Sequence, residues 1–340
     1  MNTAVEKLTA DSLRRAADLI SRGQVVAFPT ETVYGLGADA LDAEAVGRIF
    51  AAKGRPQDNP LIVHIADMEQ AFPLCHWSDT AQELAQAFWP GPLTLILPKK
   101  PIIPDTVSAG LPTVGIRLPG HQGALTFLRA CGRPVAAPSA NRSGRPSPTT
   151  AQHVYDDLQG RIPLILDGGP TQVGLESTVL DISGDVPTIL RPGAVTPEQI
   201  SMVAGTCQVA DSVMRPLMQG ESAPSPGMRH RHYAPQGRMT LFDGDPLAVA
   251  NAIKLEHDSE PRSRILAMEA HLGYYGARRV DSLGPDAASA AHRLFYLLRD
   301  YDAQGIERIL CEALPKDGLG LAVMNRLARA AEFDIRHIGL

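Results

Sequence analysis

Short apolar runs alternate with amphipathic stretches along the first 203 residues of the chain. Residues 10–22 carry Leu13, Ala16 and Ile20 at helical spacing, and Gly23 ends this predicted helix before a buried strand over residues 24–28. Further strands are predicted over residues 61–65, 93–97, 114–118, 135–137, 164–167, 179–182 and 188–191. Helices are predicted among them, over residues 43–52, 80–88, 123–130 and 150–158. This irregular alternation predicts an α/β domain that is not a simple doubly wound sheet.

The pattern breaks between about residues 203 and 237, where Gly, Ser, Pro and Met replace the apolar period. Beyond the break, strands are predicted over residues 239–242, 265–268, 279–282 and 309–313, and helices over 285–301 and 320–332. The sequence therefore predicts a first domain over residues 1–203, a linker over 204–237 and a smaller α/β domain over 238–340.

Composition and charge argue against nonspecific nucleic-acid binding, a zinc cluster, a disulfide framework and a membrane span. A net charge of −5 over 340 residues gives no global positive field for holding a nucleic-acid backbone, so any anion must be bound locally. The four cysteines lack the paired spacing of a zinc cluster or a disulfide framework: Cys75, Cys131, Cys207 and Cys311. The polar amino terminus is unlike a signal peptide, and no run of about 18 apolar residues occurs. We expect a cytoplasmic protein without a membrane span.

The first informative segment is Pro-Thr-Glu-Thr-Val-Tyr-Gly-Leu-Gly at residues 29–37. It follows a buried strand, and ligands bind at the carboxyl ends of strands in α/β sheets. Hydroxyl groups of Thr32 and its neighbours therefore suit a polar substrate. The alternative is a plain turn in which Gly35 and Gly37 supply unusual backbone angles.

The second segment joins a helix end to a strand through a Gly/Pro loop, over residues 53–64. Lys53 and Arg55, two residues apart, suit a polyphosphate, because guanidinium grips phosphate oxygens and ammonium acts as a movable charge. Lys53 alone is also explained as the dipole partner of a helix end. Asn59 lies in the loop, whereas His64 lies in an apolar strand, where a core histidine is the commoner explanation.

The third segment, residues 138–149, is a loop rich in donors that follows a strand. Ser139, Asn141 and Ser147 suit phosphate or ribose oxygens, and the loop's Gly lets backbone N–H groups approach an anion. The alternative is a surface loop in which Ser147 or Thr149 caps the next helix.

Two arginines stand within or at the end of apolar strands. Arg191 precedes Pro-Gly at the end of a strand and is interpreted as pointing into a ligand site, near the Glu-Ser-Thr segment that starts at residue 176. Arg117 lies within an apolar run, where an arginine requires an anionic partner. None of these segments matches a Walker loop, a dinucleotide fingerprint, a nucleophile elbow or a zinc-binding helix.

Taken in order, these segments resemble the YrdC-type threonylcarbamoyl-AMP synthase family in its long form, and the Ser-Pro-Gly-Met-Arg-His-Arg-His-Tyr-Ala-Pro run at residues 225–235 resembles the long form's linker. The resemblance implies a twisted mixed sheet bent around a large concave basic cavity. It also implies a smaller Rossmann-like α/β domain at the carboxyl end, for which the sequence offers no motif that we can interpret.

The resemblance also implies roles for individual residues. Threonine would be held by Thr32, His64, Arg117, Ser177 and the backbone of Ala137. ATP would contact Arg55, Asn59, Thr113, Ser139, Ser147 and Arg191, and Tyr233 would reach back from the linker to close the pocket. Lys53 and Arg55 would act as catalysts near the phosphates. Magnesium would arrive with the ATP phosphates, without side-chain ligands of its own.

The implied reaction converts ATP, L-threonine and bicarbonate into threonylcarbamoyl-AMP and pyrophosphate, a nucleotidyl transfer. It is the first step in forming threonylcarbamoyladenosine at tRNA position 37, and a separate transferase complex would receive the product, with a weak direct tRNA contact as a further expectation. An RNA-binding module without catalysis is the alternative. The hydrogenase maturation carbamoyltransferases share a similar domain, but their zinc-finger cysteines have no counterpart here.

Overall fold

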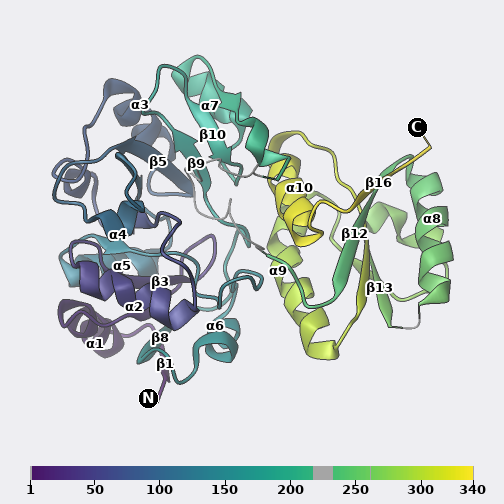
Figure 1. Cartoon of the computed structure of the whole chain (residues 1–340), viewed down its shortest axis with the longest axis horizontal. Helices are drawn as coiled ribbons and strands as arrows, with labels where there is room; N and C mark the ends of the chain where they lie inside the picture. Colours follow the sequence, from purple (N-terminus) through teal and green to yellow (C-terminus); the bar gives the residue numbers. More distant parts are fainter. Residues whose placement is uncertain (1, 217–232, 261, 340) are drawn as a thin grey trace.

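A computed structural model describes residues 2–216, 233–260 and 262–339. The chain forms two lobes, each built on its own sheet, and Figure 1 shows the helices α9 and α10 of the second lobe facing the first. Residues 217–232 of the predicted linker, and with them most of the motif at 225–235, lie outside the described residues.

The larger lobe contains a mixed sheet in the order β1-β8-β2-β3-β7-β4-β6-β5-β9-β10-β11. Its strands are β1 (Ala4–Lys7), β2 (Val26–Phe28), β3 (Gly35–Asp39), β4 (Ile62–His64), β5 (Leu93–Pro98), β6 (Thr113–Arg117), β7 (Val135–Ala136), β8 (Leu164–Asp167), β9 (Thr178–Asp181), β10 (Thr188–Arg191) and β11 (Gln208–Val209). β11 continues this sheet beyond the boundary predicted at residue 203, because it pairs in parallel with β10.

The segment after β2 is a strand, not the turn that its glycines suggested as an alternative. Gly35 begins β3, which runs antiparallel to β2. A Cβ atom on Gly37 would lie 2.7 Å from Cγ1 of Val135 and 3.0 Å from the ring of Phe28, so the space next to the backbone requires glycine there. Unusual backbone angles are not the reason, since neither Gly35 nor Gly37 has a positive φ.

Helices cover the larger sheet, and all of those named next except α4 begin at a polar cap residue. They are α1 (Ala10–Ser21), α2 (Ala43–Lys53), α3 (Asp79–Phe88), α4 (Asp105–Ser108), α5 (Gln122–Cys131), α6 (Ala151–Leu158) and α7 (Pro197–Ala204). The cap of α6 is Thr150, whose side chain accepts a hydrogen bond from the backbone of His153, so the predicted caps at Ser147 and Thr149 were wrong.

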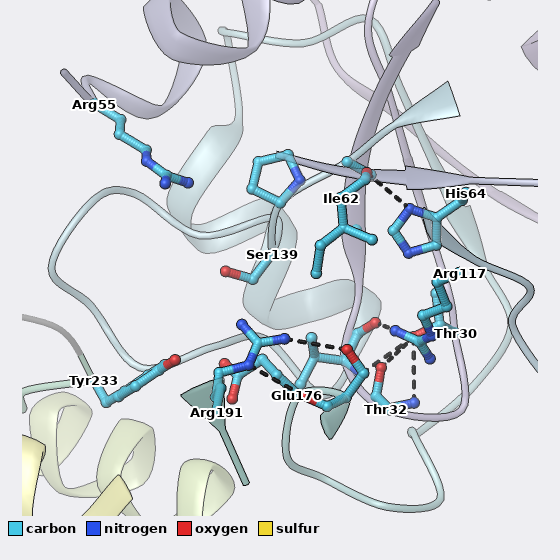
Figure 2. Close-up of a pocket in the computed structure, with 15 residues that line it drawn as sticks. Thr30, Thr32, Arg55, Ile62, His64, Arg117, Ser139, Glu176, Arg191 and Tyr233 are labelled. Carbon is cyan, nitrogen blue, oxygen red and sulfur yellow. Dashed lines mark hydrogen bonds between the residues drawn. The ribbon is translucent and has the colours of Figure 1, made fainter. Parts of the chain in front are cut away.

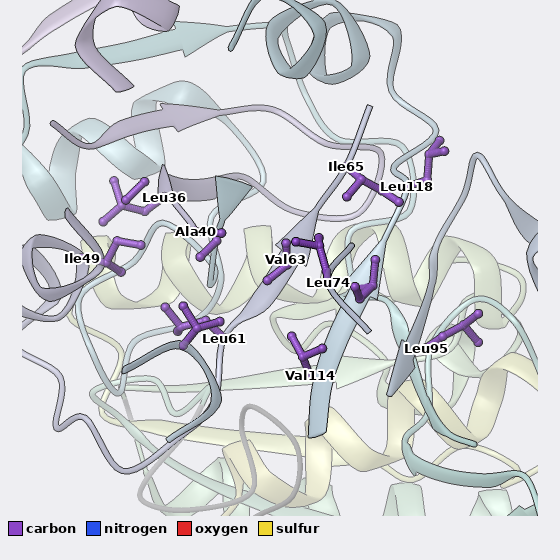
Figure 3. Packing of buried hydrophobic residues seen from close by; sticks show 14 of the residues in the cluster. Leu36, Ala40, Ile49, Leu61, Val63, Ile65, Leu74, Leu95, Val114 and Leu118 are labelled. Atoms are coloured by element: carbon purple, nitrogen blue, oxygen red, sulfur yellow. The ribbon is translucent and has the colours of Figure 1, made fainter. Parts of the chain in front are cut away.

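The core of the larger lobe lies between the sheet and these helices. Figure 3 shows side chains from β3, β4, β5 and β6 packing with Ile49 of α2. Val63 and Ile49 are completely buried. This packing holds the strand ends that carry the predicted site residues in fixed positions.

The smaller lobe contains an all-parallel sheet in the order β14-β13-β15-β12-β16. It comprises β12 (Arg238–Gly244), β13 (Ser263–Ala267), β14 (Val280–Ser282), β15 (Arg308–Glu312) and β16 (Ile335–Ile338), with α8 (Pro246–Ser259), α9 (Ala287–Gln304) and α10 (Gly318–Ala330). The parallel α/β architecture agrees with the predicted fold class. Its strand order differs from the dinucleotide-binding sheet, in which the first two strands are neighbours, because β15 lies between β12 and β13.

The two lobes share a hydrophobic cluster. Val33 and Leu175 of the larger lobe pack with Leu294 and Phe295 of α9, and Tyr233 belongs to the same cluster. Among the described residues, no helix combines the length and the apolar character that a bilayer crossing requires.

Candidate functional site

A pocket opens where several strands of the larger sheet end, next to the smaller lobe. It encloses about 570 Å³ of space free of atoms. Its lining residues are Thr30, Thr32, Val33, Gly35, Arg55, Ile62, His64, Arg117, Ala137, Pro138, Ser139, Glu176, Ser177, Arg191 and Tyr233. The folded chain thus brings the three segments at residues 29–37, 53–64 and 138–149 to a single place. The segment that starts at residue 176, the strand end at Arg191 and one residue of the predicted linker join them there.

Nine of the predicted site residues line this pocket: Thr32, Arg55, His64, Arg117, Ala137, Ser139, Ser177, Arg191 and Tyr233. Four others are placed elsewhere. Lys53 and Ser147 lie behind the pocket wall, and Thr113 lines a smaller neighbouring pocket that shares Ile62 with the first. Asn59 is completely buried, and its two amide atoms have no hydrogen-bond partner within the described part of the chain.

His64 ends β4 and is both a buried core residue and a pocket residue. Its Nδ1 donates to the carbonyl oxygen of Ile62 at 3.2 Å, and its ring meets Phe28 edge-on at 5.9 Å between centroids. Burial, reinforced by the charge of Arg117, lowers the pKa of His64 to about 3. The ring is therefore neutral at physiological pH.

Arg117 has the anionic partner that its place in an apolar strand demanded. Its Nη2 lies 2.8 Å from Oε1 of Glu31, and its Nε donates to the carbonyl oxygen of Gly91 at 3.3 Å. Burial alone would raise the pKa of Glu31, but the Arg117 charge and several hydrogen bonds outweigh it, and the pKa lies below its ordinary value. Sequence reasoning missed Glu31, although the requirement for an anion near Arg117 pointed to an acidic residue in the pocket segments.

Arg55 is buried without a carboxylate in hydrogen-bond contact. It is 9% exposed, and its Nε and Nη2 atoms have no hydrogen-bond partner among the described residues. The guanidinium lies 5.9 Å from the ring centroid of Phe50. Burial lowers the pKa of Arg55 to about 10, so the side chain remains a cation at neutral pH. Buried, unpaired N–H donors on a cation make this end of the pocket suited to an anion.

Lys53 faces the loop behind Ser139. Its Nζ donates to the carbonyl oxygens of Ser139 and Asn141, the latter at 2.6 Å, and to Oδ1 of Asn141 at 3.3 Å. An ammonium has three N–H donors, so this loop uses all of them. Burial first, and the charge of Arg55 next, hold the pKa of Lys53 well below its usual value. In this structure Lys53 orients the loop that presents Ser139, and its predicted place near phosphates stays a prediction.

Ser177 and Arg191 come from the adjoining ends of β9 and β10. Arg191 donates from Nη2 to Oγ of Ser177 and from Nε to its carbonyl oxygen, both at 3.1 Å. Oγ of Ser177 also lies 2.8 Å from the hydroxyl of Thr94. Glu176, which the sequence analysis did not single out for the site, lines the pocket beside them and accepts a hydrogen bond from the buried Ser147.

Tyr233 enters the pocket from the carboxyl side of residues 217–232. Its φ of 64° is in the left-handed region, which a tyrosine adopts only when surrounding packing fixes it. Its ring stacks on Phe295 of α9 at 5.4 Å between centroids. The second lobe therefore holds this residue against the pocket.

Figure 2 shows that the labelled lining residues gather at two opposite ends of the pocket. His64, Arg117 and Thr32 gather at one end, Arg55 and Tyr233 stand at the other, and Ser139 and Arg191 lie between them. One end suits a small ligand with a carboxylate and a hydroxyl, and the other suits a polyanion. Among the described residues, no group of three His, Cys, Asp or Glu side chains is arranged to hold a metal ion.

Comparisons with known proteins cover nearly the whole chain. A family profile described as "Telomere recombination" matches residues 18–193, and one described as "Threonylcarbamoyl-AMP synthase, C-terminal domain" matches residues 195–332. The chain is 47% identical to a threonylcarbamoyl-AMP synthase of Bacillus subtilis, over 94% of this chain and 92% of the relative. It is 45% identical to that of Pyrococcus abyssi, over 97% of each. The solved structure of P. abyssi Sua5 complexed with L-threonine matches 99% of both chains, with a TM-score of 0.91 and 43% identity.

Proposed function

This chain belongs to the threonylcarbamoyl-AMP synthase family, and we propose that it converts ATP, L-threonine and bicarbonate into threonylcarbamoyl-AMP and pyrophosphate. The observation that carries the proposal is the two-ended pocket. The buried guanidinium of Arg55, whose Nε and Nη2 have no hydrogen-bond partner in the described part of the chain, lies at one end, and Arg117 with His64 lies at the other. Such a pocket can hold a nucleotide and an amino acid side by side, as a reaction between them requires.

We place threonine at the end formed by Thr32, His64 and Arg117. A neutral His64 can exchange hydrogen bonds with the substrate without repelling its ammonium group. Arg117 can attract the threonine carboxylate while Glu31 balances the remaining charge. Ser177 and the backbone of Ala137 complete this end of the pocket.

We place the ATP phosphates against Arg55, Ser139 and Arg191. A guanidinium can bind phosphate oxygens in bidentate fashion, and the N–H groups of Arg55 that lack a hydrogen-bond partner among the described residues would gain one. Thr113 lines the neighbouring pocket with Ile62, which extends the space available to the nucleotide, and the buried Asn59 directly precedes Pro60 of that pocket in the chain. Tyr233 closes the phosphate end.

The chain has no need of a covalent intermediate. The amine of threonine combines with carbon dioxide from bicarbonate, and an oxygen of the N-carboxy group attacks the α-phosphorus of ATP as pyrophosphate leaves. Positioning and charge neutralisation are the means by which proteins accelerate such transfers. At about 4 Å and an effective dielectric near 20, each cation–phosphate pair contributes roughly 4 kcal/mol before desolvation is deducted.

We propose that magnesium enters this pocket as a complex with the ATP phosphates. The pocket carboxylates Glu31 and Glu176 already face Arg117 and Ser147, which leaves the phosphates as the principal ligands. When bound, the ion would neutralise charge on the phosphate oxygens. The chain's own contribution is the orientation of those phosphates by Arg55 and Arg191.

Threonylcarbamoyl-AMP is a labile mixed anhydride, so we propose that a separate tRNA-modifying transferase consumes it in the cytoplasm. A weak contact of this chain with tRNA would shorten the transfer. Its overall charge of −5 argues against strong binding to nucleic acid.

Purified protein tests the proposal directly. Pyrophosphate release should require ATP, threonine and bicarbonate together, and mass spectrometry should detect threonylcarbamoyl-AMP. An unchanged rate of pyrophosphate release when threonine is omitted would refute the proposed reaction.

A further inference from the structure

Arg326, in the helix α10 of the smaller lobe, reaches into the wall of the pocket in the larger lobe. It is completely buried and is the largest side chain in that state among the described residues. Its Nε lies 2.8 Å from Oε2 of Glu176, and its Nη1 donates to the carbonyl oxygen of Pro192 at 3.0 Å. Its neighbour Asn325 accepts a further hydrogen bond from Nη1 at 2.7 Å.

The two contacts in the larger lobe adjoin pocket residues. Glu176 directly precedes Ser177, and Pro192 directly follows Arg191. The backbones of these two segments cross closely, since a Cβ atom on Gly193 would lie 2.3 Å from the backbone nitrogen of Thr178. A single guanidinium therefore fixes both strand ends at the point where they cross.

The same guanidinium supports the residue that closes the pocket. It lies 5.4 Å from the ring centroid of Tyr233, which also stacks on Phe295. Because Tyr233 has a left-handed backbone, its position depends on such packing. Arg326 thus contacts three pieces of the pocket wall that are far apart in sequence.

Arg326 also determines the charge that the pocket presents to a ligand. Burial alone would raise the pKa of Glu176, but the charges of Arg326 and then Arg191 outweigh it, and the carboxylate stays ionised. Glu176 lines the same pocket as Arg55 and Arg191. Without Arg326, a partly uncompensated carboxylate would face the phosphates and repel them.

We propose that Arg326 is a positioning residue for the nucleotide end of the pocket: it holds Arg191 in place through Pro192, and it neutralises Glu176. This inference rests on the proposed function and assigns the second lobe a task in it. Arg326 does not line the pocket, so it acts through the residues that do.

The experiment compares four full-length variants with the wild-type chain. Arg326→Met removes the cation, Arg326→Lys keeps a positive charge without the planar guanidinium, and Glu176→Gln combined with Arg326→Met removes both charges of the buried pair. Arg308→Gln is the matched control, because Arg308 is a buried arginine of the same lobe that pairs with Glu256, and neither residue lines the pocket. The readouts are KM for ATP, KM for threonine, kcat and the melting temperature.

We expect Arg326→Met to raise KM for ATP at least about tenfold, the factor that corresponds to one weakened buried charge interaction. KM for ATP should rise less in Arg326→Lys than in Arg326→Met. It should also rise less in the double variant, because a glutamine side chain at position 176 would not repel the phosphates as the Glu176 carboxylate does. Arg308→Gln should keep KM for ATP within about twofold of wild type, since about 0.4 kcal/mol corresponds to that ratio.

Wild-type kinetic constants in Arg326→Met, or an equal rise of KM in Arg308→Gln, would overturn the inference. If Arg326→Met does not fold, the same test is applied to Arg326→Lys and the double variant, and wild-type kinetic constants in both would overturn the inference. Failure of the wild-type chain to release pyrophosphate would refute the proposed function instead. In that case, equilibrium binding of a non-hydrolysable ATP analogue to the same variants still tests the inference.

Discussion

The neutrality of His64 predicts a specific loss of stability in acid. The perturbation is a change from pH 7.5 to pH 5, applied to the wild-type chain and to His64→Gln. In the folded chain the pKa of His64 is lowered from 6.5 to about 3, first by burial and then by Arg117. The unfolded chain binds a proton at His64 below about pH 6.5, whereas the folded chain does not bind it until near pH 3.

The sign and the size follow from linkage. Between the two pKa values the unfolded state binds more protons, so stability falls as pH falls. At pH 5 the contribution is about 1.36 kcal/mol per unit multiplied by the 1.5 units between 6.5 and 5, or about 2 kcal/mol, and at pH 7.5 it is close to zero. For a lobe of this size, about 2 kcal/mol corresponds to a melting-temperature change of roughly 4–8 °C.

Thermal melts at both pH values measure the difference between the two proteins. On acidification, wild type should lose about 4–8 °C more than His64→Gln, by the linkage magnitude above. His76→Gln, which removes an exposed histidine, serves as the control and should follow wild type. Parallel melting curves for wild type and His64→Gln would show that His64 is not held neutral in the fold.

Three further outcomes are expected. Arg55→Met should raise KM for ATP at least about tenfold without lowering the melting temperature, because a ligand-binding cation with unpaired buried donors adds little to stability; equal losses of folding and activity would make Arg55 structural. Gly193→Ala should lower the melting temperature by several degrees and reduce kcat/KM, because its Cβ would clash with Thr178, whereas Gly47→Ala, inside α2 with no atom within 4 Å, should raise the melting temperature slightly and leave kcat/KM unchanged in assays that follow melting and pyrophosphate release. Chelation of magnesium with excess EDTA should stop pyrophosphate release, and activity that persists there would contradict the role given to the ion.

The elements that sequence reasoning located have strong local patterns. β8 and β10 were predicted at their observed bounds, because each is a continuous apolar run between turn residues. β1 and β16 were missed, because each is a four-residue strand at a sheet edge in which no residue is fully buried, so its apolar pattern is weak. β3 was ambiguous because its glycines look like turn residues until Phe28 and Val135 are seen against them.

The pocket residues on strand ends were predictable, but their partners were not. Arg117 visibly needed an anion, yet no local pattern identifies Glu31 as that anion. The sequence placed Lys53 near phosphates because Arg55 stands two residues away. In the fold its N–H groups donate to the loop at Ser139 and Asn141, a contact that no local pattern indicates. Arg326 and Glu176 lie 150 residues apart, so only the docking of the two lobes brings them together.

The docking of α9 and α10 also bears on how the chain is made. Arg299 of α9 binds Asp157 at 2.8 Å and the carbonyl oxygen of Pro146 at 2.5 Å, so the donor-rich loop of the larger lobe is also braced from the second lobe. During synthesis the amino-terminal part of a protein leaves the ribosome first. A nascent chain that has exposed only the larger lobe therefore lacks both arginine braces, and its pocket wall is completed only when the final hundred or so residues have emerged.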